Sequence, residues 1–443
     1  MATDPTAVQL ANELADLIKR SGLKSGAVVA SEQDLRARHD VGRSVLRQAA
    51  RILEERGVAF MKRGAGGGLI VAPPDPEAAG RALAILLESR MQGPHALDRL
   101  LKATDTHVFL TATPRLDLIE CERVRQLAIR LRRQTEAGLR PLGEIRQLLS
   151  AIRRLVKDPL AGLAYQTTAE YGEDLVPYSV IVGGNDFQGA WWDALLEMVE
   201  AQMAGDVAAL FDLRRRQLAI IQDSQDAWSA IDRDSRLVPE IETEASTEAG
   251  PGQNPAERLV RELLRDVRLL GWSPGARIGG NRDLLARYGV TVGTLRQAVR
   301  MLEQNSVVRM GRGRSGGLVV TLPDPAKAID RALDYLRQTE IAPDDLASFR
   351  RQLVLKSLSA ICELPNAARA KVMEGVAPAD LFCRIGALSG DGALEAFDAI
   401  VWAIAPVPET SDDRALPLIL DALAKGDAAR ARRIFLNHEQ AHL

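Results

Sequence analysis

Cysteine is scarce in this sequence of 443 residues, which contains only Cys121, Cys362 and Cys383. Three scattered thiols are too few for a disulfide framework or a structural zinc site, and they fit a protein of the reducing cytoplasm. The first residues lack the basic and then apolar pattern of a signal peptide, and no apolar run approaches the roughly 18 residues that would span a bilayer. We therefore expect a soluble, cytoplasmic protein that does not enter a membrane.

Net charge is also small, at −2 for the whole chain, and this value alone does not suggest a nucleic-acid partner. The charge is unevenly distributed, however. Residues 8–73 carry +4 and residues 257–322 carry +7, so the rest of the chain carries −13. Two basic modules with acidic neighbours are expected when only those modules meet phosphate groups.

The two basic segments repeat one another. The stretch "LRQAARILEERGVAFMKRGAGGGLIVAPPDP" begins at Leu46, and "LRQAVRMLEQNSVVRMGRGRSGGLVVTLPDP" begins at Leu295. Identities continue upstream without a gap, at a constant offset of 249 residues. A unit of about 67 residues that occurs twice is too long for a solenoid repeat, so we interpret it as a duplicated domain.

Within the first copy, "AVQLANELADLIKRS" has the apolar spacing of a helix. "SEQDLRARHDV" opens with Ser31 and Asp34 in a capping-box arrangement, which predicts a short second helix around Leu35. After a tight turn, "GRSVLRQAARILEERG" predicts a third helix, and "VAFMKRGAGGGLIVA" predicts a hairpin around residues 64–68. The predicted order is a helix, a helix-turn-helix and a β-wing.

The rest of the chain contains amphipathic segments such as "CERVRQLAIRLRRQ", which predict helices. A break at "RLVPEIETEASTEAGPGQNPAE" is acidic, rich in Pro, Gly, Ser and Thr, and typical of a flexible linker. The predicted domains are a winged helix at 7–76, a helical domain at 77–232, a linker at 233–255, a second winged helix at 256–325 and a second helical domain at 326–443.

The segments "SEQDLRARHDVGRSVLRQAARILEERGVAFMKRGAGGGLIV" and "NRDLLARYGVTVGTLRQAVRMLEQNSVVRMGRGRSGGLVV" resemble the N-terminal winged helix of GntR-type bacterial transcription regulators. The segments "LLEMVEAQMAGDVAAL" and "LILDALAKGDAARARRIFLNHEQ" are similar to the end of the helical effector domain of the FadR subfamily. The resemblance implies a mainly α fold, with two winged helix-turn-helix domains, each followed by an all-helical effector-type domain. Because the family works as homodimers, we expect an intrachain pseudo-dimer, and further homodimerisation is left open.

The resemblance also implies that DNA meets the start of the second helix, the start of the third helix and the wing tip. In the first copy the matching residues are Gln33, Gly42, Arg43, Ser44, Val45, Arg47, Arg63 and Gly64. In the second copy they are Arg282, Thr291, Val292, Gly293, Thr294, Arg296, Arg312 and Gly313.

For any one of these arginines an ordinary solvated helix face is the better explanation, but the whole arrangement in duplicate favours contact with DNA. Arg43 has the fork that binds guanine O6 and N7, whereas Val292 lacks hydrogen-bonding groups. Because the copies differ at Gln33/Arg282 and at Arg43/Val292, we expect an operator with two unlike half-sites.

Two motifs that suggest enzymes have simpler explanations. "GRSGG" at 313–317 fits a nucleophile elbow, but a strand follows where that motif needs a helix, and the first copy has no serine there. "HEQAH" at 438–442 fits a zinc-binding pattern, but we interpret it as a surface helix end because a third ligand in the usual downstream place is lacking. No catalytic constellation remains, so we expect neither an enzyme nor a cofactor.

Many FadR-subfamily effector domains bind a divalent metal through an aspartate and three histidines. Here Tyr165, Leu195, Cys383 and Leu416 stand where the resemblance places histidines. We therefore expect no metal. A small organic acid or acyl effector is implied by the resemblance alone, and its binding residues are not identified.

The sequence thus predicts a sequence-specific regulator of transcription, such as a repressor, that binds a double-stranded DNA operator. The alternative is an architectural or protein-interaction module with weak, non-specific DNA binding and no effector. Preference for one sequence over competitor DNA separates these two hypotheses.

Overall fold

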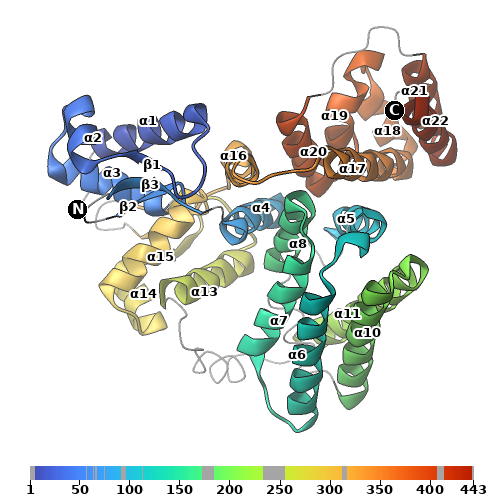
Figure 1. Cartoon of the computed structure of the whole chain (residues 1–443), viewed down its shortest axis with the longest axis horizontal. Coiled ribbons are helices and arrows are strands. Elements are labelled where there is room, and N and C mark those ends of the chain that lie inside the picture. The colour runs from blue at the N-terminus through green and yellow to red at the C-terminus, as the bar shows by residue number, and fades with distance from the viewer. Residues whose placement is uncertain are drawn as a thin grey trace. The chain divides into compact units, whose positions relative to one another are not determined.

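The computed structural model describes residues 5–55, 57–62, 64, 67–73, 75–90, 96–111, 113–171, 184–232, 255–311, 317–406 and 414–441. The described part is mainly helical, as the sequence predicts, and none of its helices is long and apolar enough to cross a membrane. It divides into two compact units, and Figure 1 labels the helices and strands that they contain. One unit comprises residues 1–86 and 254–340, and the other comprises residues 87–253 and 341–443.

The N-terminal module of the first unit is a winged helix-turn-helix, which we call the first head. Its elements are α1 (Pro5–Ser21), β1 (Val28–Ala30), α2 (Glu32–His39), α3 (Arg43–Glu55), β2 (Ala59–Lys62) and β3 (Gly68–Val71). The three strands form an antiparallel sheet in the order β1-β3-β2, in which Ile70 pairs with both Val28 and Phe60. The predicted order of helices and hairpin is confirmed, and β1 is an additional strand.

The core of the first head lies between α1, α3 and the sheet. Apolar residues at helical spacing, such as Leu10 and Leu14 in α1 and Leu46 and Leu53 in α3, are almost fully buried there. All four residues of β3 are buried, because this central strand has neighbours on both edges and apolar residues on both faces. The hairpin sequence therefore lacks the strict alternation of a half-exposed strand.

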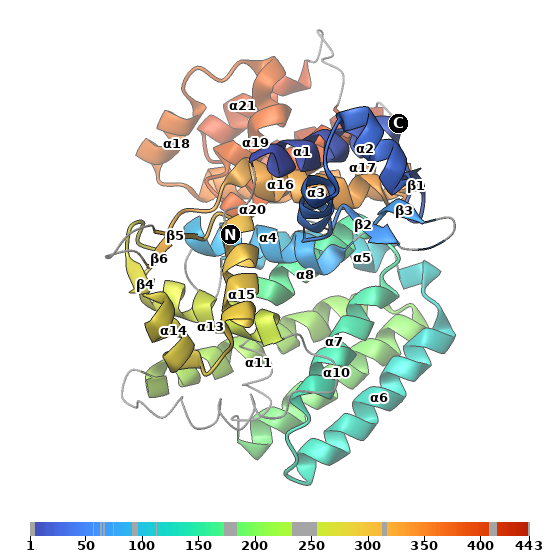
Figure 2. The same cartoon turned by 90° about the vertical axis from the view of Figure 1, so that its left-hand side faces the viewer.

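Residues 255–320 have the same order of elements, and we call them the second head. They form α13 (Pro255–Leu269), β4 (Arg277–Gly279), α14 (Asn281–Tyr288), α15 (Val292–Gln304), β5 (Val308–Met310) and β6 (Leu318–Val320). The sheet order is β4-β6-β5, which matches the order in the first head. Figure 2 shows α13, α14 and α15 beside this second sheet.

Each head is followed by a helix, α4 (Pro76–Arg90) after the first and α16 (Pro325–Arg337) after the second. Ile85 of α4 is buried in the core of the second head, in the same cluster as Leu263 and Leu295. In α16, Arg331 donates to Asn305 Oδ1 at 2.8 Å. The helix after the first head thus packs against the second head and ties the two together within the first unit.

The second unit contains two sets of helices, and we call them the first and second helical domains. The first comprises α5 (Asp98–Thr111), the 3₁₀ turn η1 (Thr113–Arg115), α6 (Leu118–Glu136), α7 (Leu142–Leu155), α8 (Pro159–Tyr171), α10 (Asn185–Ala204) and α11 (Val207–Asp232). Its largest core cluster joins α6, α7 and α10 around Trp191 and Trp192.

The second helical domain comprises α17 (Pro343–Glu363), α18 (Asn366–Met373), the 3₁₀ turn η2 (Pro378–Asp380), α19 (Leu381–Leu388), α20 (Gly392–Ile404), α21 (Ala415–Ala424) and α22 (Ala428–Ala441). Both domains end with a Gly-Asp turn between helices. Gly205 and Gly426 adopt positive φ and close one helix. Asp206 and Asp427 then accept the backbone N–H groups of Ala209 and Arg430 at the start of the next.

The two helical domains meet through α5 and α17, which occupy equivalent places under the 249-residue offset. The Arg115 guanidinium donates two hydrogen bonds to the Asp345 carboxylate, and Arg99 bonds both Glu363 and Asp391. These ion pairs join the halves of the second unit. Of the predicted linker 233–255, all but Pro255 lies outside the described residues.

Candidate nucleic-acid interface

The start of α2 in the first head is fixed by its cap. Ser31 Oγ accepts the backbone N–H of Asp34 at 3.1 Å, which confirms the capping arrangement expected from the sequence. The helix ends at Asp40, whose φ of 48° turns the chain toward α3. This two-helix turn leaves the side chain of Gln33 exposed at the start of α2.

The first turns of α3 carry most of the residues predicted to contact DNA. Gly42, Arg43, Ser44 and Arg47 are exposed, whereas Val45 is half-buried against the core. In a helix-turn-helix, this end of the second helix of the motif enters the major groove. The structure therefore brings these five residues together on one edge of the head.

Arg43 has a partner that the sequence did not suggest. Its Nε lies 2.9 Å from Oε1 of Glu32, so an ion pair joins the first residue of α3 to the first residue of α2. The two side chains are 63% and 38% exposed, so the pair stays accessible to a ligand. Glu32 lies two residues after the end of β1. It gave no sequence signal, because acidic residues are common at helix starts.

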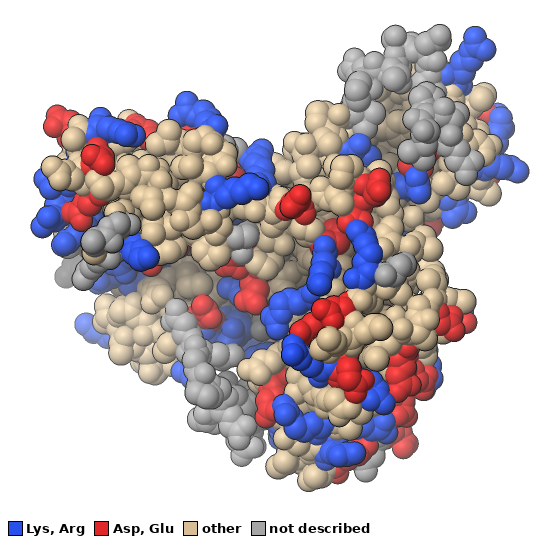
Figure 3. Space-filling view, viewed as in Figure 1, with Lys and Arg blue, Asp and Glu red and all other residues tan. Residues whose placement is uncertain are grey.

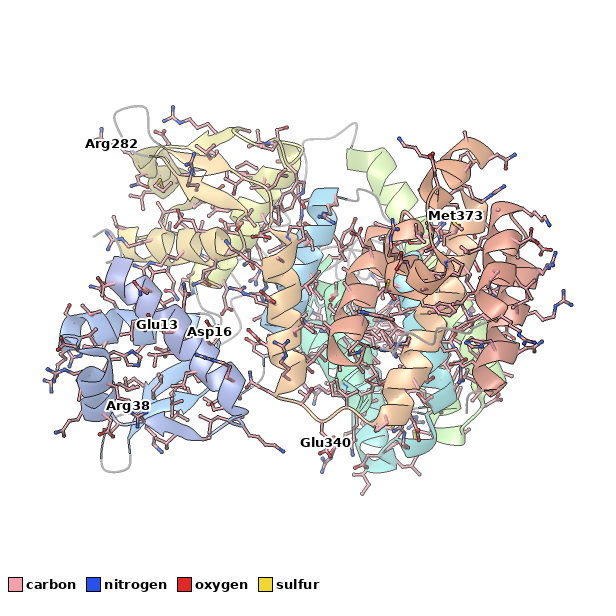
Figure 4. The ribbon with its side chains drawn as sticks, turned by 90° about the horizontal axis from the view of Figure 1, so that it is seen from above. Glu13, Asp16, Arg38, Arg282, Glu340 and Met373 are labelled. Atoms are coloured by element: carbon pink, nitrogen blue, oxygen red, sulfur yellow. The ribbon has the colours of Figure 1, made fainter. Side chains whose placement is uncertain are left out.

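The second head presents an equivalent edge with different chemistry. Arg282, Thr291, Val292, Gly293 and Arg296 are exposed, and Thr294 is half-buried. Thr291 caps α15 by accepting the backbone N–H of Thr294 at 3.2 Å, and the two hydroxyl groups lie 2.9 Å apart. Figure 4 shows Arg282 at the outer edge of this head.

The wings are described only in part. Gly64 is exposed with φ of 104°, and its carbonyl accepts the backbone N–H of Gly67 at 2.9 Å. Arg63, Arg312 and Gly313 were predicted to contact DNA, but nothing is said of their placement because they lie outside the described residues. Ser315 of the elbow-like motif also lies outside them.

The surface of the first head carries basic groups of several elements. Figure 3 shows lysine and arginine side chains along its edge, interspersed with acidic ones. Arg38, Arg43, Arg47 and Lys62 are among the exposed cations. Such a mixed but net basic surface supplies phosphate contacts without strong repulsion within the protein.

In the first helical domain, a buried polar network occupies the place where the resemblance expected a metal-binding histidine. Tyr165 donates its hydroxyl proton to Asp105 Oδ1 at 2.8 Å, and Arg214 donates to the other oxygen at 3.0 Å. Burial raises the pKa of Tyr165 well above its usual value, and the neighbouring Asp105 carboxylate raises this pKa further. The phenol therefore stays protonated and acts as a donor.

Of the other expected histidine positions, two hold leucines, which have no metal-ligating atom, and one holds Cys383. Leu195 and Leu416 are buried in apolar clusters. Cys383 is exposed, and its thiol donates to the Asp380 carbonyl oxygen at 3.2 Å. Partial desolvation, and then the charge of Asp380, raise the pKa of this thiol. The prediction of no metal stays a prediction.

One group of possible metal ligands was missed, because its residues come from distant segments. The ligand atoms of His107, Asp158 and Asp345 lie within 4.8 Å of one another and are buried. His107 Nε2 lies 2.5 Å from Asp158 and its Nδ1 lies 3.0 Å from Ser348 Oγ, while Asp345 is bound by Arg115. Each of the three already has a protein partner, so the group acts here as part of the α5–α17 contact.

The C-terminal "HEQAH" motif is described only in part, because His442 lies outside the described residues. His438 and Glu439 lie on α22, and the Glu439 carboxylate accepts a hydrogen bond from Arg351 of α17 at 2.5 Å. This carboxylate is therefore committed to an ion pair within the second helical domain.

The fold and the exposed helix edge define the N-terminal module as a winged helix-turn-helix, a class of domain that binds DNA. Residues 6–68 match the family described as "Bacterial regulatory proteins, gntR family", so this part of the chain is a GntR-family helix-turn-helix domain. Among solved structures, the chain is similar to Streptococcus agalactiae GntR, at 17% identity and a TM-score of 0.32, over 49% of this chain and 99% of that one. No curated protein matches this chain.

Proposed function

We propose that this protein is a cytoplasmic, sequence-specific transcription regulator that carries two DNA-reading heads in one polypeptide. The carrying observation is that the second head repeats the elements and the sheet order of the GntR-family domain at a constant sequence offset. Duplication of a winged helix with its helical domain explains this repeat. The domain boundaries proposed from the sequence, at residues 76, 232, 255 and 325, follow from the same duplication.

The arrangement of the halves supports an intrachain pseudo-dimer of the FadR type. Equivalent helices α5 and α17 pair within the second unit, as the same helix from two subunits would pair about a two-fold axis. In the first unit, Ile85 of α4 packs into the core of the second head. The contact of Ile85 reduces the independence of the two heads within the first unit, which favours binding to two half-sites at a set spacing.

The proposed DNA contacts are the residues exposed at the helix starts of both heads, together with the wing tips named above. Because Arg43 corresponds to Val292 and Gln33 to Arg282, the two half-sites should differ. Control by a small organic acid or acyl ligand is kept only as part of the FadR-type proposal. The Tyr165–Asp105–Arg214 network and the apolar Leu195 and Leu416 support a helical domain that works without a metal.

The test is selection of fragments bound by the full chain from the genome that encodes it, followed by footprinting at near-physiological salt. A short protected site with two unlike halves is the expected result. A perfect palindrome would contradict the unlike half-sites. Uniform recovery of fragments, with binding that collapses as salt rises, would contradict sequence-specific regulation and favour the architectural role.

A further inference from the structure

The first residue of the third helix has opposite chemistry in the two heads. Helices α3 and α15 are each 13 residues long, and they begin at Arg43 and Val292, which are related by the 249-residue offset. Both side chains are exposed. A side chain at this place in a helix-turn-helix reaches base edges in the major groove, so the two heads present a cation and an aliphatic group to equivalent base pairs.

We propose that Arg43, held by Glu32, reads a guanine in one half-site, and that Val292 reads the methyl group of a thymine at the equivalent position of the other. This inference rests on the proposed function and assigns bases to it. Glu32 is a positioning residue, because it acts through Arg43.

The geometry of the Arg43–Glu32 pair leaves the right donors available. Arg43 Nε donates a hydrogen bond to Glu32 Oε1. Among the described residues, no hydrogen bond engages the two terminal nitrogens of Arg43. Those two nitrogens form the fork that matches O6 and N7 of guanine. Exposed ion pairs contribute little to folding, so the effect of Glu32 falls on the orientation of a long, flexible side chain rather than on stability.

The second head has no equivalent of this pair. Asn281 replaces Glu32 and Val292 replaces Arg43, so neither charge is present. The hydroxyls of Thr291 and Thr294 bond each other and the helix cap, which turns them toward the backbone. Val292, 55% exposed, is then the side chain that protrudes.

An exposed valine can discriminate among base pairs in only one way. The major-groove edges of the four bases carry donors, acceptors and one apolar group, the thymine methyl. Gly293 follows Val292, and a Cβ built on it would meet only Thr291 Oγ1, at 3.6 Å. The absence of a side chain there lets the helix start approach the groove closely.

The experiment uses the full chain and the operator obtained by selection, with single bases replaced by analogues. Replacing the guanine by 7-deazaguanine removes the N7 acceptor, and replacing the thymine by deoxyuridine removes only the methyl group. The first replacement should weaken operator binding by the wild type roughly 5- to 150-fold, and it should leave operator binding by the Arg43→Ala variant unchanged. The second replacement should weaken operator binding by the wild type about 4-fold, which is the effect of one methyl group, and it should leave operator binding by the Val292→Ala variant unchanged.

The role of Glu32 is tested by a ratio of affinities, which a merely structural residue would not change. Glu32→Ala should reduce the preference for guanine at that position. Its affinity for non-specific DNA should not fall, because the substitution removes a negative charge from the DNA-facing surface. Glu32→Gln keeps the acceptor and should restore the preference. Equal preference in all three proteins would overturn the positioning role.

The double variant Arg43→Val with Val292→Arg gives a matched control, since it has the composition of the wild type. It should prefer the operator in which the two base pairs have been exchanged. If a specific operator is found but neither analogue weakens binding, this inference is wrong and the proposed function stands. If selection returns no preferred sequence, both are wrong.

Discussion

Tyr165 and Asp105 are joined by a 2.8 Å hydrogen bond in the interior of the first helical domain, and Arg214 binds the second oxygen of the same carboxylate. We expect Tyr165→Phe to destabilise the chain by about 1–3 kcal/mol, because one carboxylate oxygen loses its donor without gaining water. The denaturant midpoint of the second unit is the measurement. An unchanged midpoint would show that the tyrosine contributes only its ring.

The same network predicts the response to metal ions. Because Arg214 supplies a positive charge to Asp105, a divalent cation would have to displace a guanidinium to bind there. Adding Zn²⁺, Mn²⁺ or Ni²⁺ should leave the thermal midpoint of the full chain unchanged. A midpoint that rises with metal concentration would contradict this expectation and would direct attention to His107, Asp158 and Asp345.

One glycine in each head lies so close to the backbone of a neighbouring strand that replacing it should destabilise the fold. A Cβ on Gly68 would lie 2.4 Å from the Ala30 carbonyl oxygen, and one on Gly317 would lie 2.6 Å from the Gly279 carbonyl oxygen. We expect each alanine variant to lose at least about 1–3 kcal/mol, because the strand paired with the glycine has to move. Thermal unfolding measures this loss.

Gly162→Ala is the matched control for that pair. Gly162 lies within α8 and a Cβ there would meet nothing within 4 Å. The substitution should stabilise the chain by about 0.5–1 kcal/mol, since alanine is the better helix former. Equal losses at Gly162, Gly68 and Gly317 would mean that close backbone approach is not the cause.

Asp398 should make stability depend on pH. Burial raises the pKa of this carboxyl to about 6, while the backbone N–H of Gly386 and the charge of Arg350 oppose the rise. The native state therefore binds the proton more tightly than the unfolded state, whose pKa is near 4. The stabilisation is complete below about pH 4, falls as pH rises through about 6, and then stays constant.

Asp398→Asn removes this cost above pH 6. We expect a gain of about 1–3 kcal/mol at pH 7 that disappears near pH 4, measured as urea midpoints across that range. Asp421→Asn serves as a control, because that carboxylate is exposed and bonded to Lys425, which lowers its pKa. A gain that is the same at every pH would point to packing rather than ionisation.

Arg47 and Arg296 occupy equivalent exposed positions one turn into α3 and α15. If each pairs with a phosphate, Arg47→Ala and Arg296→Ala should each weaken operator binding and reduce the salt slope by roughly one unit. Arg140→Ala, an exposed position between α6 and α7, should leave the slope as it is. A slope that is also unchanged in both head variants would refute phosphate pairing.

Local signals in the sequence predicted the heads well. Ser31 and Asp34 gave the start of α2, and the glycine-rich hairpin gave the positions of β2 and β3. The three-residue β1 was missed because its pairing partner, β3, lies about forty residues further on. A short edge strand is defined by that partner rather than by its own pattern.

For the candidate site, the sequence predicted which residues are exposed at the helix starts, but it did not predict which side chains contact one another. The exposed starts of α3 and α15 follow from the helical period, and they were predicted. The Glu32–Arg43 pair and the Tyr165–Asp105–Arg214 network were not predicted, because each depends on side chains that meet across elements. Such contacts are set by packing geometry, which a one-dimensional pattern does not contain.

The ion pair between Arg115 of the first helical domain and Asp345 of the second has no symmetric counterpart. Under the 249-residue offset, its mirror counterpart would join Leu364 to Ala96, and neither residue carries a charge. If α5 met α5 of another molecule, Arg115 would face an alanine and remain without its carboxylate. If the chain is the pseudo-dimer proposed above, this one-sided ion pair would let it distinguish its own two halves, and exchange of halves between molecules would be disfavoured by chemistry as well as by tethering.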